Sequence, residues 1–419
     1  MKKKTIIISI IILFTVIIIT ALSFLYIKNK AIIKEEEKKE ALIIEITNKY
    51  NKYVITNKNA NIYELINNKY IEIGQISKSV ELELESIDIN INTKYFVITN
   101  LDNKYYISYK DVDKTDKIND IKDIRYKNYI PYNQNIITKD KTKFYKNIKL
   151  IYQVNKSFNL PIIIKENESY YVIHNDKLME VKKEDVAEVV ENNNTELSNA
   201  KNIPVITYHA IYDPNGTGDK CYNIICHPIA QFDSHMKYLK ENNFFTPTMR
   251  EFEMYLDYKL QLPSKSVLIT IDDGTLANLG IDILEKYELN NTLFLITAWF
   301  NKEEFKTTYG EIHSHGHNLH NTGVCPGGQG GGIKCLPKEV ILEDLKQSRN
   351  ILDQTTVFCY PFYEYNNYAI DLVKEAGFTM AFIGGNRRVT LGIDKMKIPR
   401  YTIVATTTLG DFKKIVDSK

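Results

Sequence analysis

Two adjacent carboxylates follow a strand-like apolar run in the second half of this 419-residue chain. Asp272, Asp273 and Gly274 come directly after Val267–Ile271. Of two neighbouring carboxylates, one can ligate a cation while the other stays free as a base. An Asp-Asp-Gly sequence also occurs in ordinary surface turns, so this pair indicates a site only together with residues elsewhere in the chain.

Four of the eight histidines lie between His313 and His320. Histidine is a common metal ligand. His315 and His320 stand about 140° apart on an ideal helix, so they could meet only from a strand end and the turn after it. His313 and His317 are competing ligands. A fortuitous histidine-rich loop and a pH-sensitive histidine pair are the alternatives to a metal site.

Two further strand ends carry groups that could do chemistry. His209 follows the apolar run 204–208, where it is either structural or a proton donor. Pro361 interrupts the run Val357–Tyr360, and a break of this kind leaves a backbone N–H, such as that of Phe362, free to stabilise an oxyanion. A simple strand terminus is the alternative at Phe362.

These polar residues belong to a region in which strand-like and helix-like runs alternate. The alternation predicts a parallel sheet or a (β/α) barrel, in which chemistry lies at the carboxyl ends of the strands. The expected strands are Val205–Tyr208, Val267–Ile271, Thr292–Thr297, Val357–Tyr360 and Met380–Ile383, and the expected helices are Gln231–Asn242, Lys338–Asp353 and Tyr368–Ala376.

Residues 203–415 resemble the NodB-homology domain of the polysaccharide deacetylases, carbohydrate esterase family 4. Thr270–Gly274 meets the family motif T-F-D-D-G, and Ser314, His315 and His320 resemble S-H-[ST]-x-x-H with one extra residue. That spacing, and the position of His209 before the first motif, are similar to the circularly arranged branch that contains poly-N-acetylglucosamine deacetylases.

The resemblance implies a role for each residue. Asp273, His315 and His320 would bind a divalent metal, in the family most often Zn²⁺, although Co²⁺, Ni²⁺ or Fe²⁺ suit the same ligands. Asp272 would be the base, His209 the acid and the Phe362 N–H an oxyanion donor. The third motif, R-x-P-Y, is met only in part by Cys359–Phe362, because its arginine is missing. Arg400 is expected to orient Asp272 instead. The residue that orients His209 is left unassigned, with Asp394 as a candidate.

The N-terminus predicts a location. Three lysines precede an uncharged run of 23 residues, Thr5–Ile27. A helix of that length spans about 35 Å, enough to cross a hydrocarbon core of about 30 Å. The lysines favour an extracytoplasmic orientation for all that follows. We therefore expect residues 1–30 to be a single-pass anchor and residues 31–50 a helical stalk, with a cleaved signal peptide as the alternative.

Residues 51–195 contain short alternating runs rich in Ile, Val and Tyr. Tyr109–Val112 is echoed by Lys183–Val186, which predicts two small β domains, residues 51–115 and 116–195, that resemble bacterial SH3-like repeats. Their tyrosines either contact the cell wall or are half-buried strand residues of a spacer. Residues 196–419 would form the catalytic domain, an α/β fold built as a distorted (β/α) barrel.

The remaining features limit the choice of partners. The net charge of +2 and the absence of a basic block with interleaved aromatics give no indication of nucleic acid. Cys325 and Cys335 flank the glycine-rich segment 327–332, either a lid closed by a disulfide or a flexible loop with free thiols. Cys221 and Cys226 could pair similarly.

The leading hypothesis is an N-deacetylase acting on the N-acetylglucosamine of peptidoglycan, which in relatives confers lysozyme resistance. Deacetylation of an exopolysaccharide such as poly-N-acetylglucosamine is the alternative within the same reaction, and an O-acetyl esterase on xylan fits an anchored protein less well. An inactive glycan-binding wall protein is the alternative of another class.

Overall fold

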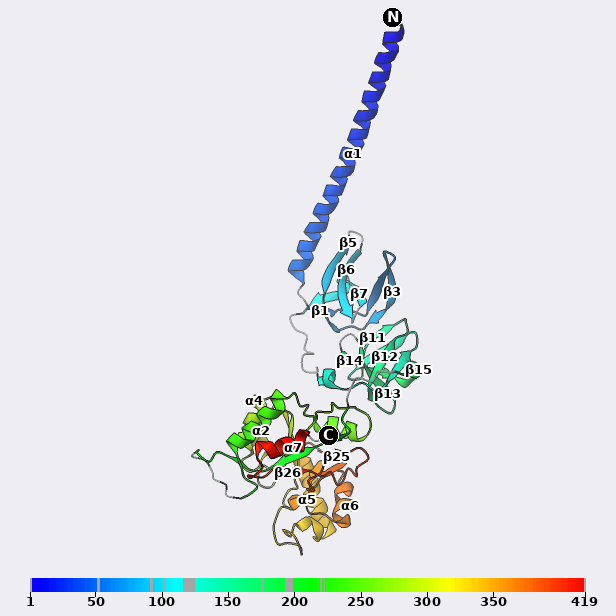
Figure 1. The fold of residues 1–419 in the computed structure, drawn as a ribbon. Coiled ribbons are helices and arrows are strands. Elements are labelled where there is room, and N and C mark those ends of the chain that lie inside the picture. Colours follow the sequence, from blue (N-terminus) through cyan, green and yellow to red (C-terminus); the bar gives the residue numbers. More distant parts are fainter. Residues whose placement is uncertain are drawn as a thin grey trace. The chain divides into compact units, whose positions relative to one another are not determined.

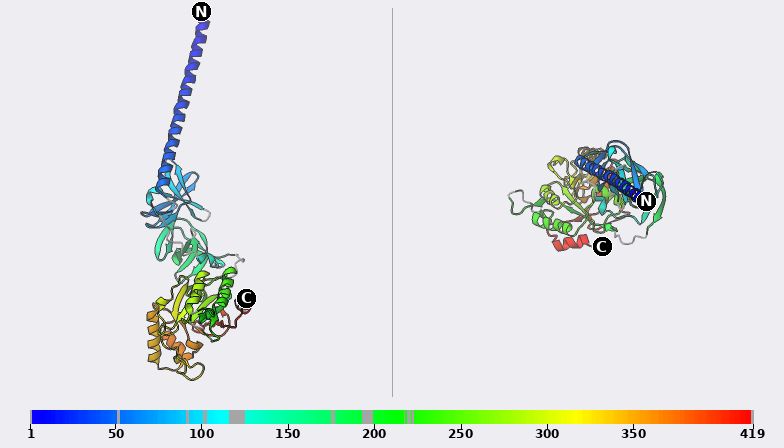
Figure 2. Two further views of the ribbon diagram at one scale, coloured as in Figure 1. Left: turned by 90° about the vertical axis from the view of Figure 1, so that its left-hand side faces the viewer. Right: turned by 90° about the horizontal axis from the view of Figure 1, so that it is seen from above.

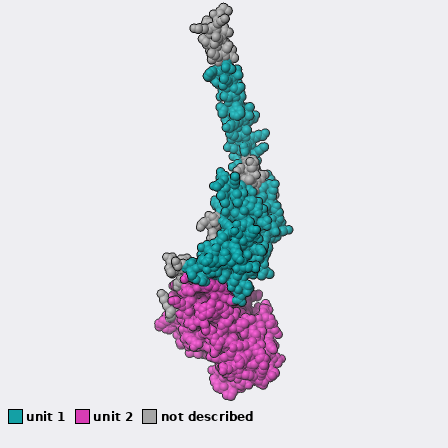
Figure 3. Space-filling view, turned by 90° about the vertical axis from the view of Figure 1, so that its right-hand side faces the viewer, with its two compact units in different colours: residues 1–126, 134–162, 167–192 teal, residues 127–133, 163–166, 193–419 magenta. Residues whose placement is uncertain are grey.

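The computed structural model describes residues 2–50, 53–90, 93–100, 103–115, 125–174, 177–192, 199–216, 218, 221 and 223–417. The chain divides into two compact units, coloured in Figure 3. Unit 1 comprises residues 1–126, 134–162 and 167–192, and unit 2 comprises residues 127–133, 163–166 and 193–419. Unit 1 contains a long helix and antiparallel strands, whereas unit 2 contains a parallel sheet.

The first element of unit 1 is the helix α1, Lys2–Lys49, which is continuous over 48 residues (Figures 1 and 2). Within its segment Leu13–Ala41, a window of 18 residues has a mean hydropathy of 1.7, so the helix is long and apolar enough to cross a membrane. A signal sequence near an N-terminus has the same properties. The expected anchor and stalk therefore form one uninterrupted helix, which is a candidate membrane span or a signal sequence.

The rest of unit 1 is built from short antiparallel strands. The strands are β1 (Tyr53–Thr56), β2 (Ala60–Ile66), β3 (Lys69–Ile76), β4 (Glu81–Glu83), β5 (Ser86–Asn90), β6 (Thr93–Asn100), β7 (Asn103–Ser108), β8 (Val112–Lys114), β9 (Gln134–Thr138), β10 (Thr142–Lys146), β11 (Lys149–Val154), β12 (Asn159–Lys165), β13 (Ser169–His174), β14 (Lys177–Lys182) and β15 (Val186–Glu191). They form a small sheet, β4-β1-β8, and a larger one in the order β15-β9-β12-β13-β14-β10-β11-β3-β2-β7-β6-β5.

The two halves of unit 1 repeat the same local features. The hairpin β2–β3 has a bulge between Ile62 and Tyr63, and the hairpin β10–β11 has one between Phe144 and Tyr145. A 3₁₀ turn precedes β8 at Tyr109–Asp111, and another precedes β15 at Lys183–Asp185. The strands after these turns pair in the same way, Val112 with Thr56 and Val186 with Thr138. The sequence echo thus has a structural counterpart, while the SH3-like assignment remains a prediction.

Unit 2 is organised around a seven-stranded sheet in which every pairing is parallel. Its order is β24-β23-β22-β21-β20-β17-β26, with β17 (Val205–Tyr208), β20 (Leu268–Asp273), β21 (Asn291–Leu295), β22 (Gly310–Ser314), β23 (Val357–Cys359), β24 (Met380–Phe382) and β26 (Tyr401–Thr402). Short two-stranded sheets pair β16 (Asn202–Ile203) with β25 (Val389–Thr390) and β18 (Ile211–Tyr212) with β19 (His227–Pro228).

Helices cover the sheet in two groups (Figure 1). The first group is α2 (Ile229–Glu241), α4 (Ala277–Lys286) and α7 (Leu409–Asp417), and the second is α5 (Lys338–Ile351) and α6 (Asn367–Glu375); α3 (Met249–Leu256) follows α2 in the chain. Each group has its own cluster of buried apolar side chains against the strands. Such side chains contribute roughly 1.5–3 kcal/mol each, so the sheet is a rigid support for whatever its ends carry.

The strand register places the polar site residues at the same end of the sheet, the carboxyl edge. Tyr208 pairs with Ile271, which brings His209 beside Asp272. In the other direction the register runs from Asp273 through Leu295 and Ser314 to Phe358. His315 and Cys359 therefore follow at the carboxyl edge. In parallel α/β folds this edge is where ligands bind.

One segment joins the two edges of the sheet. Ile398 exchanges backbone hydrogen bonds with Ala381 and Ile383 beside β24, at 2.9 and 2.8 Å. Three residues later, β26 pairs with β17. The distorted (β/α) barrel expected from the sequence corresponds, in the described residues, to a parallel half-barrel sheet whose two edges are joined by the segment 398–402. Arg400 lies in the middle of this segment.

Candidate functional site

Asp273, His315 and His320 converge at the carboxyl edge of the sheet. Asp273 Oδ1 lies 3.3 Å from His315 Nε2 and 3.4 Å from His320 Nε2. The three side chains could hold a metal ion, because their ligand atoms all lie within 4.8 Å of one another. The sequence prediction that one carboxylate and these two imidazoles meet is consistent with this geometry.

The donor set fits a divalent cation. Two ligands about 2.1 Å from one tetrahedral ion lie about 3.4 Å apart, which is close to the separations found here. Asp273 Oδ1 is buried and has no hydrogen-bond partner in the described part of the chain. His315 Nδ1 donates to the Cys359 carbonyl at 2.8 Å, which fixes the ring with its Nε2 toward Asp273. Burial lowers the pKa of His320 to about 4, which keeps its imidazole neutral.

Asp273 has a left-handed backbone conformation, and its carboxylate lies beside the two imidazoles. Its φ is +74°, and Gly274 follows with a φ of +102°. A Cβ on Gly274 would lie 2.8 Å from Leu295 Cδ1 and 2.9 Å from Phe300 Cδ2, so a side chain cannot be accommodated there. Left-handed φ at a non-glycine residue costs of order 1–3 kcal/mol and is retained where the surrounding structure enforces it.

Asp344 explains how the longer histidine spacing still converges. This buried residue of α5 accepts the backbone N–H of His317 at 2.8 Å and that of Asn318 at 2.6 Å. Gly316, with a φ of +85°, starts the turn that these bonds fix. The carboxylate therefore folds the four residues between His315 and His320 back toward the sheet.

Asp272 is paired with Arg400. The Nη1–Oδ1 and Nη2–Oδ2 distances are both 2.7 Å, and both side chains are fully buried. Arg400 Nη1 also donates to Thr207 and Thr270, each at 3.2 Å. Burial alone would raise the pKa of Asp272, but the guanidinium holds it well below its usual range. Arg400 thus occupies the orienting position expected from the sequence.

Cys359 stands where the family motif has arginine, and it contacts the same pair. Its Sγ lies 2.9 Å from Arg400 Nη2 and 3.6 Å from Asp272 Oδ2. The thiol is free and buried, whereas the other four cysteines form the disulfides Cys221–Cys226 and Cys325–Cys335, which decides between the two alternatives left open by the sequence. An arginine from the segment before β26 therefore contacts the same carboxylate as this thiol.

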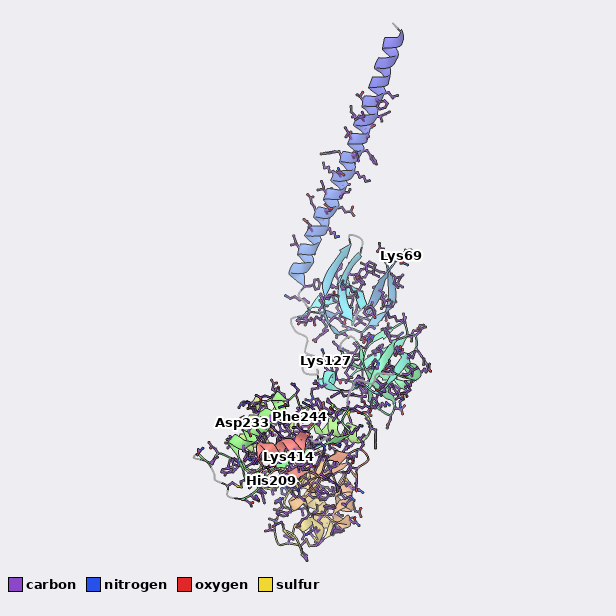
Figure 4. The ribbon with its side chains drawn as sticks, viewed as in Figure 1. Lys69, Lys127, His209, Asp233, Phe244 and Lys414 are labelled. Atoms are coloured by element: carbon purple, nitrogen blue, oxygen red, sulfur yellow. A yellow bond between two sulfur atoms is a disulfide. The ribbon has the colours of Figure 1, made fainter. Side chains whose placement is uncertain are left out.

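His209 lies next to the Asp272 carboxylate of this pair; Figure 4 labels it within unit 2. Its Nε2 is 3.9 Å from Asp272 Oδ2 and 3.4 Å from the Tyr363 hydroxyl. Burial lowers the pKa of His209, although the Asp272 carboxylate opposes that effect. Its Nδ1 has no hydrogen-bond partner among the described residues.

The expectation that Asp394 orients His209 is wrong. The Asp394 carboxylate accepts the Met396 N–H at 3.0 Å and pairs with Lys397 at 3.0 Å. It caps its own turn instead of reaching the sheet edge. Tyr363, which the sequence analysis did not single out, is the side chain that contacts the imidazole.

Phe362 lies beside the metal-ligand candidates. Its ring centroid is 4.1 Å from that of His320, and its φ is +57° within the short 3₁₀ turn Pro361–Tyr363. The hydrogen bonds of this turn are donated by Tyr363 and Glu364, to Tyr360 and Pro361. In the described residues the Phe362 N–H has no such acceptor, as required of an oxyanion donor.

The competing histidines have other partners. His313 is bonded through Nδ1 to the Thr355 hydroxyl at 2.6 Å, and His317 Nδ1 to the Thr297 hydroxyl at 3.0 Å. Neither belongs to the Asp273 group. The alternation of a continuing strand, which made them candidates, ends at Ser314, where β22 ends.

Two residues beside the site, Asp344 and Tyr363, were not predicted from the sequence, each for a different reason. Asp344 had a usable signal, because it lies among the buried residues Ile341, Leu345 and Ser348 on one face of α5. An acidic residue on an apolar helix face requires a partner. Tyr363 had no such signal, because its place depends on the left-handed backbone that follows Pro361.

The fold and the site define an α/β domain with a candidate metal-binding Asp-His-His group and a buried Asp–Arg pair at the carboxyl edge of a parallel sheet. Residues 259–381 match the polysaccharide deacetylase family. This part of the chain is therefore similar to polysaccharide deacetylase domains.

Proteins and solved structures that are similar to this chain are named as deacetylases. The poly-beta-1,6-N-acetyl-D-glucosamine N-deacetylase of Staphylococcus aureus (strain MSSA476) is 28% identical over 196 residues, which is 42% of this chain and 66% of that protein, slightly under two thirds of its length. A de-N-acetylase from Aggregatibacter actinomycetemcomitans is 20% identical, with a TM-score of 0.44 over 51% of this chain and 99% of that one. The Streptococcus pyogenes deacetylase PplD is 18% identical, with a TM-score of 0.44 over 53% and 100%.

Proposed function

We propose that this protein is a metal-dependent N-deacetylase that removes acetyl groups from N-acetylglucosamine units of a cell-surface polysaccharide. The observation that carries the proposal is the convergence of Asp273, His315 and His320 next to the separate, arginine-paired carboxylate of Asp272. A binding module would need neither the spare carboxylate nor a buried imidazole beside it. Amide hydrolysis requires both a base and an acid.

Asp273, His315 and His320 would hold the cation. Two imidazole nitrogens and one carboxylate suit Zn²⁺, and also Co²⁺, Ni²⁺ or Fe²⁺. When bound, such an ion lowers the pKa of a water molecule toward about 7 and polarises a carbonyl oxygen. The protein supplies the buried ligand atoms, which are oriented by the Cys359 carbonyl and the Asp344 carboxylate.

Asp272 and His209 would move the protons. Asp272 Oδ2 accepts the proton of the attacking water, and Arg400 fixes the direction of that carboxylate. His209 Nε2 lies 3.9 Å from that oxygen, receives the same proton from Asp272 and donates it to the departing amine. Because burial lowers the pKa of His209, the protonated imidazole gives up its proton readily. The Phe362 N–H would stabilise the oxygen of the acetyl group as it becomes negative.

We propose poly-N-acetylglucosamine as the first candidate substrate and peptidoglycan as the second. This order is the reverse of the one inferred from the sequence alone. The S. aureus relative is named for the β-1,6-linked polymer. The spacing of His315 and His320 also resembles that branch. Peptidoglycan remains the second candidate, because the apolar helix α1 would hold an extracytoplasmic enzyme at the membrane, close to the wall.

Acetate release from the two glycans, measured side by side, tests the proposal. The full-length chain is purified in detergent, treated with a chelator and reloaded with Zn²⁺ or Co²⁺. We expect metal-dependent acetate release, faster from poly-N-acetylglucosamine than from peptidoglycan. The control Asp272→Asn should bind metal normally but lose at least about 100-fold in kcat, because it lacks the base.

Two outcomes would contradict the proposal. Equal acetate release by the parent chain and Asp272→Asn would exclude hydrolysis at this site. Glycan binding without acetate release by the metal-loaded parent would favour an inactive glycan-binding protein. Faster acetate release from peptidoglycan would support the proposed N-deacetylation but would reverse the order of the two candidate substrates.

A further inference from the structure

A disulfide-closed glycine loop contacts the residues that follow Pro361. Cys325 and Cys335 close the loop, and Glu364 lies against it. The Glu364 carboxylate accepts the backbone N–H groups of Gln329 and Gly331, the latter at 2.8 Å. It thereby binds two separate backbone positions of the loop.

Lys334 completes this arrangement from within the loop. Its Nζ lies 2.9 Å from Glu364 Oε2 and donates to the Gly327 carbonyl at 2.8 Å. The side chains of Lys334 and Glu364 are only 17% and 13% exposed, so the ion pair is largely withdrawn from water. Partly buried pairs of this kind are screened less than surface pairs.

The glycines are needed where the carboxylate enters the loop. A Cβ on Gly328 would lie 1.8 Å from Glu364 Oε1. A Cβ on Gly331 would lie 3.2 Å from both Glu364 Oε2 and Phe362 Cδ2. The loop is therefore shaped around Glu364 and the neighbouring aromatic ring, which distinguishes it from an ordinary flexible loop.

Glu364 directly follows two residues with left-handed backbone. Phe362 and Tyr363 have φ values of +57° and +59°, a conformation that costs each of them of order 1–3 kcal/mol. The Phe362 ring packs on His320, and the Tyr363 hydroxyl lies 3.4 Å from His209. These two residues thus face the metal-ligand candidates and the proposed acid, while Glu364 faces the loop.

We propose that Glu364 is a positioning residue, which uses the disulfide-closed loop as a fixed support to hold Phe362 and Tyr363 in their strained conformation at the site. The inference rests on the proposed function and adds one requirement to it: turnover depends on an intact disulfide-closed loop. Among the described residues, the contacts of the Glu364 carboxylate are with the loop, so its loss should change the turnover rate without changing metal binding.

The test compares Glu364→Ala and Glu364→Gln with a matched control, Glu285→Ala, in the full-length chain. Glu285 Oε1 also accepts two loop N–H groups, those of Thr308 and Tyr309 at 2.8 and 2.9 Å, but at the opposite end of β22. For Glu364→Ala we expect kcat to fall about 10- to 100-fold, because displacement of a reacting group by about 1 Å has effects of that size. KM and bound Zn²⁺ should stay within about twofold of the parent.

Glu364→Gln keeps one acceptor oxygen, so its kcat should lie between those of Glu364→Ala and the parent. The control Glu285→Ala should have the kcat of the parent. Unchanged kcat in Glu364→Ala would overturn the inference, as would a loss of Zn²⁺ in proportion to kcat. If Glu364→Ala does not fold, the kcat of Glu364→Gln decides in the same way.

A second measurement separates this inference from the proposed function. Hydrogen exchange at the Gln329 and Gly331 amides should be faster in the Glu364 variants than in the parent, whatever the substrate. Unchanged exchange at these amides would overturn the inference that Glu364 is held by the loop. A parent chain that releases no acetate from either glycan would overturn the proposed function, whereas faster exchange would still support the link between Glu364 and the loop.

Discussion

The guanidinium of Arg400 contacts both carboxylate oxygens of Asp272, with two distances of 2.7 Å between residues 128 positions apart in the chain. Neither side chain is exposed to water. Removing one partner of such a buried pair leaves an uncompensated charge, at a cost of about 3–5 kcal/mol, whereas replacing both can be nearly neutral. The pair therefore ties the stability of the sheet to the geometry of the site.

The first prediction follows from this pair. Arg400→Met should lower the free energy of unfolding of the full-length chain by about 3–5 kcal/mol, because Asp272 then remains buried and charged. The double variant Arg400→Met/Asp272→Asn should recover part of that loss. Denaturant titration of both variants measures the difference. Equal stability of the single and double variants would show that the charge of Asp272 is balanced in another way.

The second prediction separates the two neighbouring aspartates. Asp273→Asn should reduce the affinity for Zn²⁺ at least about 10-fold, because a neutral amide replaces the only carboxylate ligand of the proposed site. Asp272→Asn should leave that affinity nearly unchanged. Titration of the chelator-treated chain with Zn²⁺ gives both values. Equal affinities in the two variants would argue against the assignment of Asp273 as ligand.

The third prediction concerns the turn between the two histidines. Asp344→Ala removes the acceptor for the His317 and Asn318 N–H groups and should weaken Zn²⁺ binding about 10- to 100-fold, as is usual when groups that orient metal ligands are lost. Asp371→Ala, on the neighbouring helix α6, is the control and should bind Zn²⁺ like the parent. Normal Zn²⁺ affinity in Asp344→Ala would mean that the turn keeps its shape without the carboxylate.

The fourth prediction concerns pH. His227 and His235 are fully buried, and burial lowers their pKa values to about 4 and about 3. On acidification the unfolded chain binds protons at these histidines near pH 6.5, before the folded chain does, so stability is full above that pH and is lost as the pH falls toward about 3. At about pH 5 each histidine should account for roughly 2 kcal/mol of lost stability.

Unfolding of the parent and of His227→Gln/His235→Gln at about pH 7.5 and about pH 5 measures this effect. The loss of stability between the two pH values should be smaller in the double variant. His235 Nδ1 also bonds the Tyr208 hydroxyl at 2.9 Å, so the variant is expected to be less stable at both values. A double variant with the same pH sensitivity as the parent would exclude these histidines as its source.

The sequence predicted those parts of unit 2 that follow regular apolar patterns. Helices expected at Gln231–Asn242 and Lys338–Asp353 are found at Ile229–Glu241 and Lys338–Ile351. The carboxyl ends of the predicted strands also identified Asp272 and His209. Periodicity and strand ends are local properties, so one sequence suffices to find them.

The features that the sequence did not predict depend on distant contacts. The strand β22 is short and polar, and β26 has only two residues, so neither has a clear strand pattern. The place of Arg400 was inferred from family resemblance alone, because only the segment that joins the sheet edges brings it to Asp272. The contacts of Asp344 and Glu364 likewise arise from turns that packing determines.

Trp299 is the only tryptophan of the chain, it is 48% exposed, and its ring centroid lies 5.5 Å from that of His320. The emission of this indole therefore originates at a single place, beside a residue proposed to bind the cation. A paramagnetic ion such as Co²⁺ or a sugar ring arriving there would alter the indole signal, whereas events in unit 1 would act only on tyrosine emission. The molecule thus contains its own optical reporter of site occupancy, without any attached dye.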